Sequence, residues 1–306
     1  MVLSSCGGSY NERAAAPTFS IPEDTYYGQQ SVELRTTTEG ASIYFTTDGT
    51  DPSESSTLYS GAIIISATET IRAIAIKEGM TNSEISTAVF TIKNIYVAGF
   101  ESDGADYIAK YWKNGEAIDL IRNAEALSIF VSGTDVYVAG FEGDFLAKYW
   151  KNGVATNLTS GSHFASAEEI FVAGTDVYVA GYESNALVEI AKYWKNGAEI
   201  SLTNGINNAH AFSIFVAGTD VYVAGYESNG TVGVAKYWKN GVETSLTNGS
   251  HDAQADSIFV LDDDVFVAGY ESNGTKDVAK YWKNGVAVNL TDGTGEAMAE
   301  SIFIGD

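Results

Sequence analysis

The chain has 306 residues, with 17 lysines and arginines against 40 aspartates and glutamates, which gives a formal net charge of −23 at pH 7. A field of this sign repels phosphate backbones, so we expect no nucleic-acid partner. A hydrophobic fraction of 45% with 19% charged residues predicts a folded protein long enough for more than one domain.

Residues 1–16 predict an anchor and a tether. The stretch "LSSCGG" at 3–8 resembles a bacterial lipobox, in which Cys6 becomes the lipidated first residue, although only five residues precede it. The resemblance implies an outward-facing protein of the bacterial cell envelope that reaches the membrane only through Cys6. The alternative is an unmodified cysteine in a tail. Cys6 is the single cysteine, so no intramolecular disulfide can form, and residues 7–17 predict a flexible tether.

Residues 17–93 predict a small antiparallel β-sandwich. Short β-branched runs alternate with turn residues: "SVELRT", "ASIYFTT", "GAIIIS", "ETIRAIAI" and "STAVFTI". In "ASIYFTTDGTDPSESSTLYSGAIII" (41–65) an aromatic strand leads into T-D-G-x-x-P, a Ser/Thr stretch and a tyrosine. This pattern resembles the C-terminal-type domain of chitobiase and β-hexosaminidase. The resemblance implies an immunoglobulin-like accessory domain without a catalytic site. A turn built by Asp48 and Gly49 and stiffened by Pro52 also explains the motif.

Residues 94–306 contain five copies of one unit. The heptapeptide "AKYWKNG" recurs, and its tryptophans are separated by 38, 44, 44 and 44 residues: Trp112, Trp150, Trp194, Trp238 and Trp282. Each complete copy predicts four short strands, and its Asn-Gly predicts a type I′ turn. Four strands in a 44-residue repeat are typical of a β-propeller blade.

The two ends of the repeat region predict how the fold closes. The first copy begins at Asn94 without a "SIFV" strand, and the last stops at "SIFIGD" (301–306), which is the strand that the first copy lacks. We therefore expect an all-β protein with a five-bladed β-propeller closed by the C-terminal strand, and a monomer. A larger ring cut short is the alternative, and it leaves an open sheet edge.

The repeated aromatic residues predict a structural role more strongly than a ligand-binding one. A large buried ring at every blade junction explains the five tryptophans. The lysine before each "YW" is expected to pair with a glutamate of the preceding strand: Glu101–Lys110, Glu142–Lys148, Glu183–Lys192, Glu227–Lys236 and Glu271–Lys280. The alternative is five equivalent sugar-binding grooves of Trp, Tyr and Asn that act together through avidity.

Two sets of loops differ in how much they vary between copies. The near-constant "ESNG" loops favour a repeated ligand, and their exposed polar residues are the candidate binding residues: Glu183, Asn185, Glu227, Asn229, Glu271 and Asn273. The loops "TSGSHFASA", "TNGINNAHA", "TNGSHDAQA" and "TDGTGEAMA" vary, which favours a protein partner. The histidines His163, His210 and His251 are expected in these loops without zinc spacing, so we expect no metal site.

The sameness of the copies argues against an enzyme, because catalysis needs unlike residues that converge once. Asp119, Asp144, Glu168 and Asp252 are singular, but they are expected in scattered loops. We expect no catalytic residues and no cofactor. The sequence predicts a non-catalytic bacterial cell-surface protein that binds carbohydrate or another surface polymer through its repeated loops. The alternative is a protein-interaction or adhesion scaffold without a small ligand, and a glycoside hydrolase is the least favoured reading.

Overall fold

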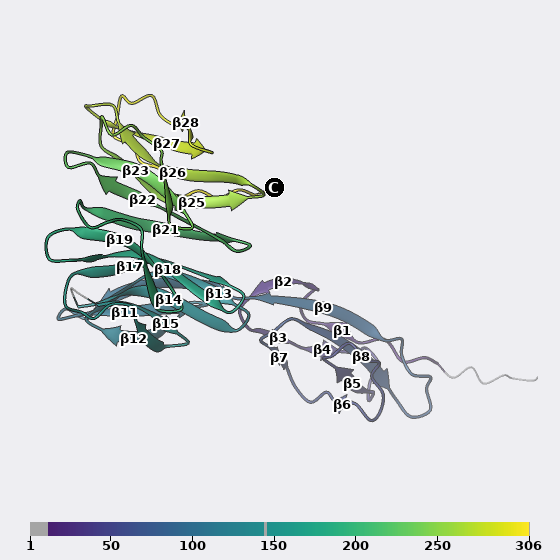
Figure 1. Ribbon diagram of the computed structural model, residues 1–306. Coiled ribbons are helices and arrows are strands. Elements are labelled where there is room, and N and C mark those ends of the chain that lie inside the picture. Colours follow the sequence, from purple (N-terminus) through teal and green to yellow (C-terminus); the bar gives the residue numbers. More distant parts are fainter. Residues whose placement is uncertain (1–11, 144–145, 306) are drawn as a thin grey trace, which may run out of the picture. The chain divides into compact units, whose positions relative to one another are not determined.

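A computed structural model describes residues 12–143 and 146–305, which divide into two compact units (Figure 1). The first unit comprises the residues up to Ile95 together with Lys113–Gly115, and the second comprises Tyr96–Trp112 and the residues from Glu116 onward. The described residues form strands and turns, and none of them belongs to a helix long and apolar enough to cross a membrane. Cys6 and Asp144 lie outside the described residues.

The first unit consists of one five-stranded sheet, in the order β2-β9-β8-β5-β6, and two strand pairs, β1-β4 and β3-β7. Its strands are β1 Thr18–Phe19, β2 Asp24–Tyr27, β3 Gln30–Val32, β4 Leu34–Arg35, β5 Ser42–Thr46, β6 Thr57–Leu58, β7 Ile63–Ile65, β8 Glu69–Ile76 and β9 Ser86–Lys93. Val32, Ile65, Ile71 and Phe90 are fully buried between these layers. All five runs predicted from the sequence contain strands, and β1, β2 and β6 are additional short ones.

The second unit consists of antiparallel sheets whose strands follow one another in chain order. The first sheet has three strands, β10 Tyr96–Ser102, β11 Tyr107–Lys113 and β12 Glu116–Arg122. The next four sheets have four strands each: β13 Ala124–Ser132, β14 Asp135–Glu142, β15 Leu146–Lys151 and β16 Val154–Asn157; β17 Ala165–Ala173, β18 Asp176–Ser184, β19 Glu189–Lys195 and β20 Ala198–Ser201; β21 Ala209–Ala217, β22 Asp220–Ser228, β23 Gly233–Lys239 and β24 Val242–Ser245; β25 Ala253–Leu261, β26 Asp264–Ser272, β27 Asp277–Lys283 and β28 Val286–Asn289. The four-stranded copies and the three-stranded first copy are as predicted.

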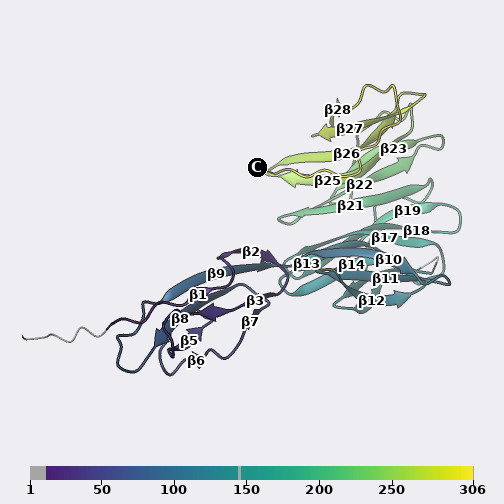
Figure 2. The ribbon, with the colours of Figure 1, turned by 180° about the vertical axis from the view of Figure 1, so that it is seen from behind.

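Four of the five repeated tryptophans fill the junctions between successive sheets, whereas Trp112 of the first sheet is only half-buried. Trp150, Trp194, Trp238 and Trp282 are at most 1% exposed. Trp194, for example, packs in one cluster with Tyr137 and Ala147 of the preceding sheet. The first strands of the sheets also contact one another, and a row of phenylalanine rings joins them at centroid distances of 5.0, 5.2, 4.9 and 5.2 Å: Phe130, Phe171, Phe215, Phe259 and Phe303. Each sheet therefore supports the next along the stack (Figure 2).

The closed ring expected from the sequence is not what the structure shows. Residues 301–305 follow the stack: Ile302 N donates to Ser257 Oγ at 3.2 Å, as Ile258 N donates to Ser213 Oγ at 3.0 Å one sheet earlier. Among the described residues, however, β10 pairs only with β11. Residues 301–305 pack against β25 of the last sheet. A closed ring would also need β10, at the other end of the stack, to pair with these residues.

Candidate functional site

The glutamates of the repeated "ESNG" segments lie in β18, β22 and β26, not in loops, and each holds a lysine of the next strand. Lys236 is 9% exposed, and its Nζ lies 2.6 Å from Glu227 Oε2 and 2.7 Å from Glu243 Oε2. Burial lowers the pKa of Lys236, but the two carboxylates outweigh it and leave the pKa above its ordinary value. All five lysine–glutamate pairs expected from the sequence are present. The second carboxylate, which Glu243 supplies here, was not expected.

The asparagines of the same segments fold the loops themselves. Asn229 Oδ1 accepts the backbone N–H groups of Thr231 and Val232 at 3.0 and 3.1 Å, and its Nδ2 donates to Gly249 O at 2.8 Å. Asn185 and Asn273 make the same set of hydrogen bonds in their own copies. The polar atoms of the predicted binding residues thus have partners within the protein, and ligand binding by them stays a prediction.

Two residues expected in loops, His210 and Glu168, lie instead on the first strands of their sheets, whereas His163 and His251 lie outside strands as expected. His210 is in β21 and pairs with Tyr226, and Glu168 is in β17. The expectation was wrong because these strands run for nine residues and include the segment before "SIF". The period-two alanines of "AHAF", "ASAE" and "AQAD" were the available signal. Asp119 likewise lies in β12, whereas Asp252 precedes β25 outside any strand.

His210 joins two sheets through an acidic and aromatic cluster. Its Nε2 lies 2.7 Å from Glu189 Oε2, and its ring stacks on Tyr182 with centroids 3.8 Å apart. Burial raises the pKa of Glu168, while Ser166 and His210 oppose that rise. Burial also raises the pKa of Tyr182, and the charges of Glu168 and Glu189 add to it. The described residues include no group of three or more metal-ligating side chains, here or elsewhere.

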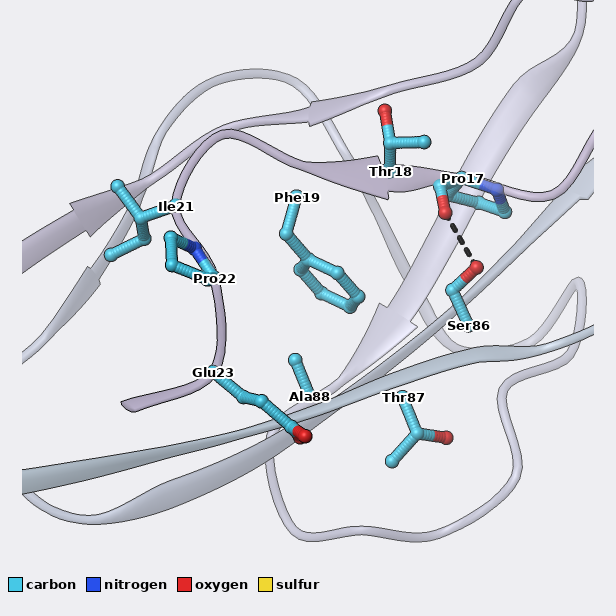
Figure 3. Close-up of a pocket in the computed structure, with 9 residues that line it drawn as sticks. All are labelled: Pro17, Thr18, Phe19, Ile21, Pro22, Glu23, Ser86, Thr87 and Ala88. Carbon is cyan, nitrogen blue, oxygen red and sulfur yellow. Dashed lines mark hydrogen bonds between the residues drawn. The ribbon is translucent and has the colours of Figure 1, made fainter. Parts of the chain in front are cut away.

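The first unit contains a groove of about 410 Å³ between the segment 17–23 and the start of β9 (Figure 3). Its lining residues are Pro17, Thr18, Phe19, Ile21, Pro22, Glu23, Ser86, Thr87 and Ala88. Ser86 Oγ donates to Pro17 O and ties the two walls together. This volume is within the range of small-ligand sites, roughly 300–1,000 Å³.

The groove exists because the ladder between β2 and β9 stops early. These strands are parallel, and their pairing begins at Asp24 opposite Phe90. Pro22 has no N–H with which to extend the ladder. Lys93 O accepts from Gly28 N at 2.8 Å, so Lys93 directs its backbone groups toward the side of β2. Alternate residues of a strand direct their backbone groups to the same side, so the N–H and C=O of Thr87 face the groove.

The groove combines apolar and polar surfaces. The Phe19 ring reaches from β1 toward Ala88 (Figure 3) and meets Phe90 edge-on at a centroid distance of 5.8 Å. The side chains of Glu23 and Thr87 are exposed at its rim. This arrangement offers an aromatic surface, a carboxylate, a hydroxyl and an open backbone edge to one ligand. The sequence did not predict this groove, because the groove depends on where the parallel pairing of β2 and β9 ends. Pro17 and Pro22, on either side of Phe19, were the one available sign that regular pairing stops there.

The first unit is an immunoglobulin-like domain. Residues 21–87 match the family described as the chitobiase/beta-hexosaminidase C-terminal domain, in agreement with the resemblance seen in the sequence. No curated protein matches the chain.

Two solved structures are similar to the chain at low scores. A quinonprotein alcohol dehydrogenase-like protein from Bacteroides thetaiotaomicron has a TM-score of 0.35 and 8% identity, with 92% of this chain and 98% of that chain covered. A DUF4784 family protein from Bacteroides caccae has a TM-score of 0.33 and 9% identity, with 93% and 97% covered.

Proposed function

We propose that the protein is a non-catalytic carbohydrate-binding protein of a bacterial cell surface, held to the membrane by a lipid on Cys6. The groove of the first unit is the observation that carries this proposal. A sugar ring packs its C–H groups on an aromatic side chain and exchanges hydrogen bonds through its hydroxyls. Phe19 supplies the aromatic surface, and Glu23 and Thr87 supply hydrogen-bonding groups.

The composition of the groove supports binding without hydrolysis. Most glycoside hydrolases use two carboxyl groups on either side of the scissile bond, one as acid and the other as base or nucleophile. Glu23 is the one carboxylate among the described residues that line this groove.

A glycan array of the full chain tests the proposal, with a Glu23→Gln variant and a Thr87→Arg variant that fills the exposed rim. We expect specific binding that Glu23→Gln weakens about tenfold and Thr87→Arg abolishes, with unchanged thermal unfolding. Asn229→Ala is the control for the repeated loops. A blank array contradicts the proposal, and so does binding that Asn229→Ala alone weakens.

We also propose that the five sheets are the blades of one propeller, with residues 301–305 completing the first blade. Two observations support this. The described part of the first sheet has no strand beyond β10, and residues 301–305 already follow the stacking of the first strands. The register of β13 on β14, which places Ser128 opposite Ala139, predicts Ser301 opposite Ala98.

A protein-interaction scaffold remains the second candidate function. One specific observation favours it: a single junction between sheets displays exposed apolar residues where the other junctions display polar ones.

A further inference from the structure

Three exposed apolar residues lie on hydrogen-bonded loops at one end of the junction between the sheets of β17–β20 and β21–β24. Phe164, Leu187 and Ile206, here called the loop patch, are 38%, 89% and 71% exposed. Phe164 O accepts from Ser184 N at 2.7 Å, and Asn185 Nδ2 donates to Gly205 O at 3.4 Å. These hydrogen bonds join the loops that carry the three residues.

The loop patch is singular within the repeat. The positions of Leu187 in the next two copies are Thr231 and Thr275, and those of Ile206 in the other copies are Ser162, Ser250 and Thr294. Phe164 corresponds to Asn208, Asp252 and Glu296. The two copies that follow therefore carry polar residues at all three positions, where this junction carries large apolar ones. Exposed apolar residues gathered in this way mark interaction sites.

A cluster of aromatic and acidic side chains lies next to Phe164 of the loop patch. The Phe164 ring lies 5.8 Å from the ring of Tyr182, on which His210 stacks. Glu189 is bound to His210, and the half-buried Glu168 lies close enough for the charge of His210 to act on its pKa. This corner of the molecule thus combines apolar side chains with two carboxylates near His210.

We propose that the loop patch, with Glu189 and Glu168 beside it, binds a protein segment that presents a large apolar side chain next to a lysine or arginine. The apolar side chain packs on Leu187, Ile206 and Phe164, and the cation is attracted by the two carboxylates. A second copy of this chain is disfavoured, because two molecules of net charge −23 repel each other. Aromatic residues and arginine are also the common anchors of protein interfaces.

A selection experiment with a matched variant tests this inference. The reverted variant carries Phe164→Asn, Leu187→Thr and Ile206→Ser, each of which installs the residue found at the same position of a sister copy. A random twelve-residue peptide library on phage is selected on the full chain and counter-selected on the reverted variant. We expect enriched peptides that pair an aromatic or aliphatic residue with lysine or arginine and bind the reverted variant at least about tenfold more weakly.

Two further variants separate the apolar from the charged contribution. Glu189→Gln is expected to weaken the selected peptides about fivefold at low salt and less at high salt. Grafting Asn208→Phe, Thr231→Leu and Ser250→Ile onto the reverted variant is expected to restore part of the binding at the next junction. The reverted variant keeps the groove of the first unit, so its glycan binding is expected to be unchanged.

The inference fails if no enriched peptide distinguishes the chain from the reverted variant, or if the peptides that do so lack a cation. It also fails if sedimentation shows that the full chain self-associates and the reverted variant does not, because the loop patch is then a contact between copies.

Discussion

At the scale of single residues, the carboxylate of Asp256 is destabilised by burial. It lies at the irregular step of β25, where the sister strands carry Leu127, Glu168 and Phe212. Its Oδ1 accepts from Gln254 Nε2 at 2.6 Å, while its Oδ2 is buried without a hydrogen-bond partner. Burial raises the pKa of Asp256 to about 6, and the nearby charge of Glu300 adds to the rise.

The Asp256→Asn variant is expected to be the more stable protein at neutral pH. Between the ordinary pKa of 3.8 and the folded pKa of about 6, the folded state binds more protons than the unfolded state. This residue therefore lowers the free energy of unfolding as the pH rises through that window. We expect Asp256→Asn to gain about 1 kcal/mol at pH 7 and almost nothing at pH 4.

Urea unfolding at pH 4, 5.5 and 7 measures this difference. Asp262→Asn removes the same charge from an exposed turn residue with positive φ, and it is expected to change stability little at any pH. A constant difference between wild type and Asp256→Asn across the three pH values would show that the carboxyl titrates normally.

At the scale of elements, the Asn-Gly turns do more than reverse the chain. Asn240 and Gly241 have φ of 52° and 80°, as the predicted type I′ turn requires. Asn240 Oδ1 also accepts from Val221 N at 2.9 Å, and its Nδ2 donates to Asp220 Oδ1 at 2.8 Å. The turn after β23 is thereby bonded to the start of β22.

Replacing Asn240 by alanine is expected to cost about 1–2 kcal/mol, because alanine fits positive φ poorly and makes neither hydrogen bond. Asn240→Asp keeps the acceptor and tolerates positive φ, but it faces Asp220 without a donor and is expected to fall in between. Thermal unfolding of both variants measures the order. Equal losses would mean that the hydrogen bond donated to Asp220, which both variants lack, accounts for the effect and the backbone angle does not.

The strands and turns also show which features of the fold could be predicted from the sequence. Strands, turns and the lysine–glutamate pairs follow from short-range patterns that five copies repeat, so they were predicted well. The hydrogen bonds of Asn229 and Asn240 reach residues about 20 positions away, and the ladder that stops at Asp24 reaches 66 positions. Contacts of that kind depend on register, and no local pattern encodes them. The place of His210 was missed for a simpler reason: a nine-residue strand was read as a short one.

At the scale of the whole molecule, one repeated glycine position distinguishes a closed ring from an open one. A Cβ at Gly225 would clash with the carbonyl of His210 on the neighbouring strand, and Gly140, Gly181 and Gly269 are in the same position. Gly99 is their counterpart in the first sheet, yet a Cβ there meets only the ring of Trp112, at 3.1 Å. The ring closure proposed above would place the backbone of Met298 where the other glycines meet a carbonyl.

Gly99→Ala and Gly225→Ala are therefore expected to lower the thermal midpoint by similar amounts, equivalent to several kcal/mol. Differential scanning calorimetry of the two variants compares them. If Gly225→Ala is strongly destabilised and Gly99→Ala is not, β10 has no strand beside it and the ring is open in solution.

The row of phenylalanines that joins the sheets has a consequence for how the chain reaches its folded state. Every junction offers nearly the same surface, so a sheet that forms early finds several competing neighbours of almost equal affinity. Connectivity favours the adjacent one, and unlike residues such as His210 with Glu189 occur at one junction alone. Those few differences are then what distinguishes correct order from misassembly, and a chain of perfectly identical copies is expected to refold with lower yield.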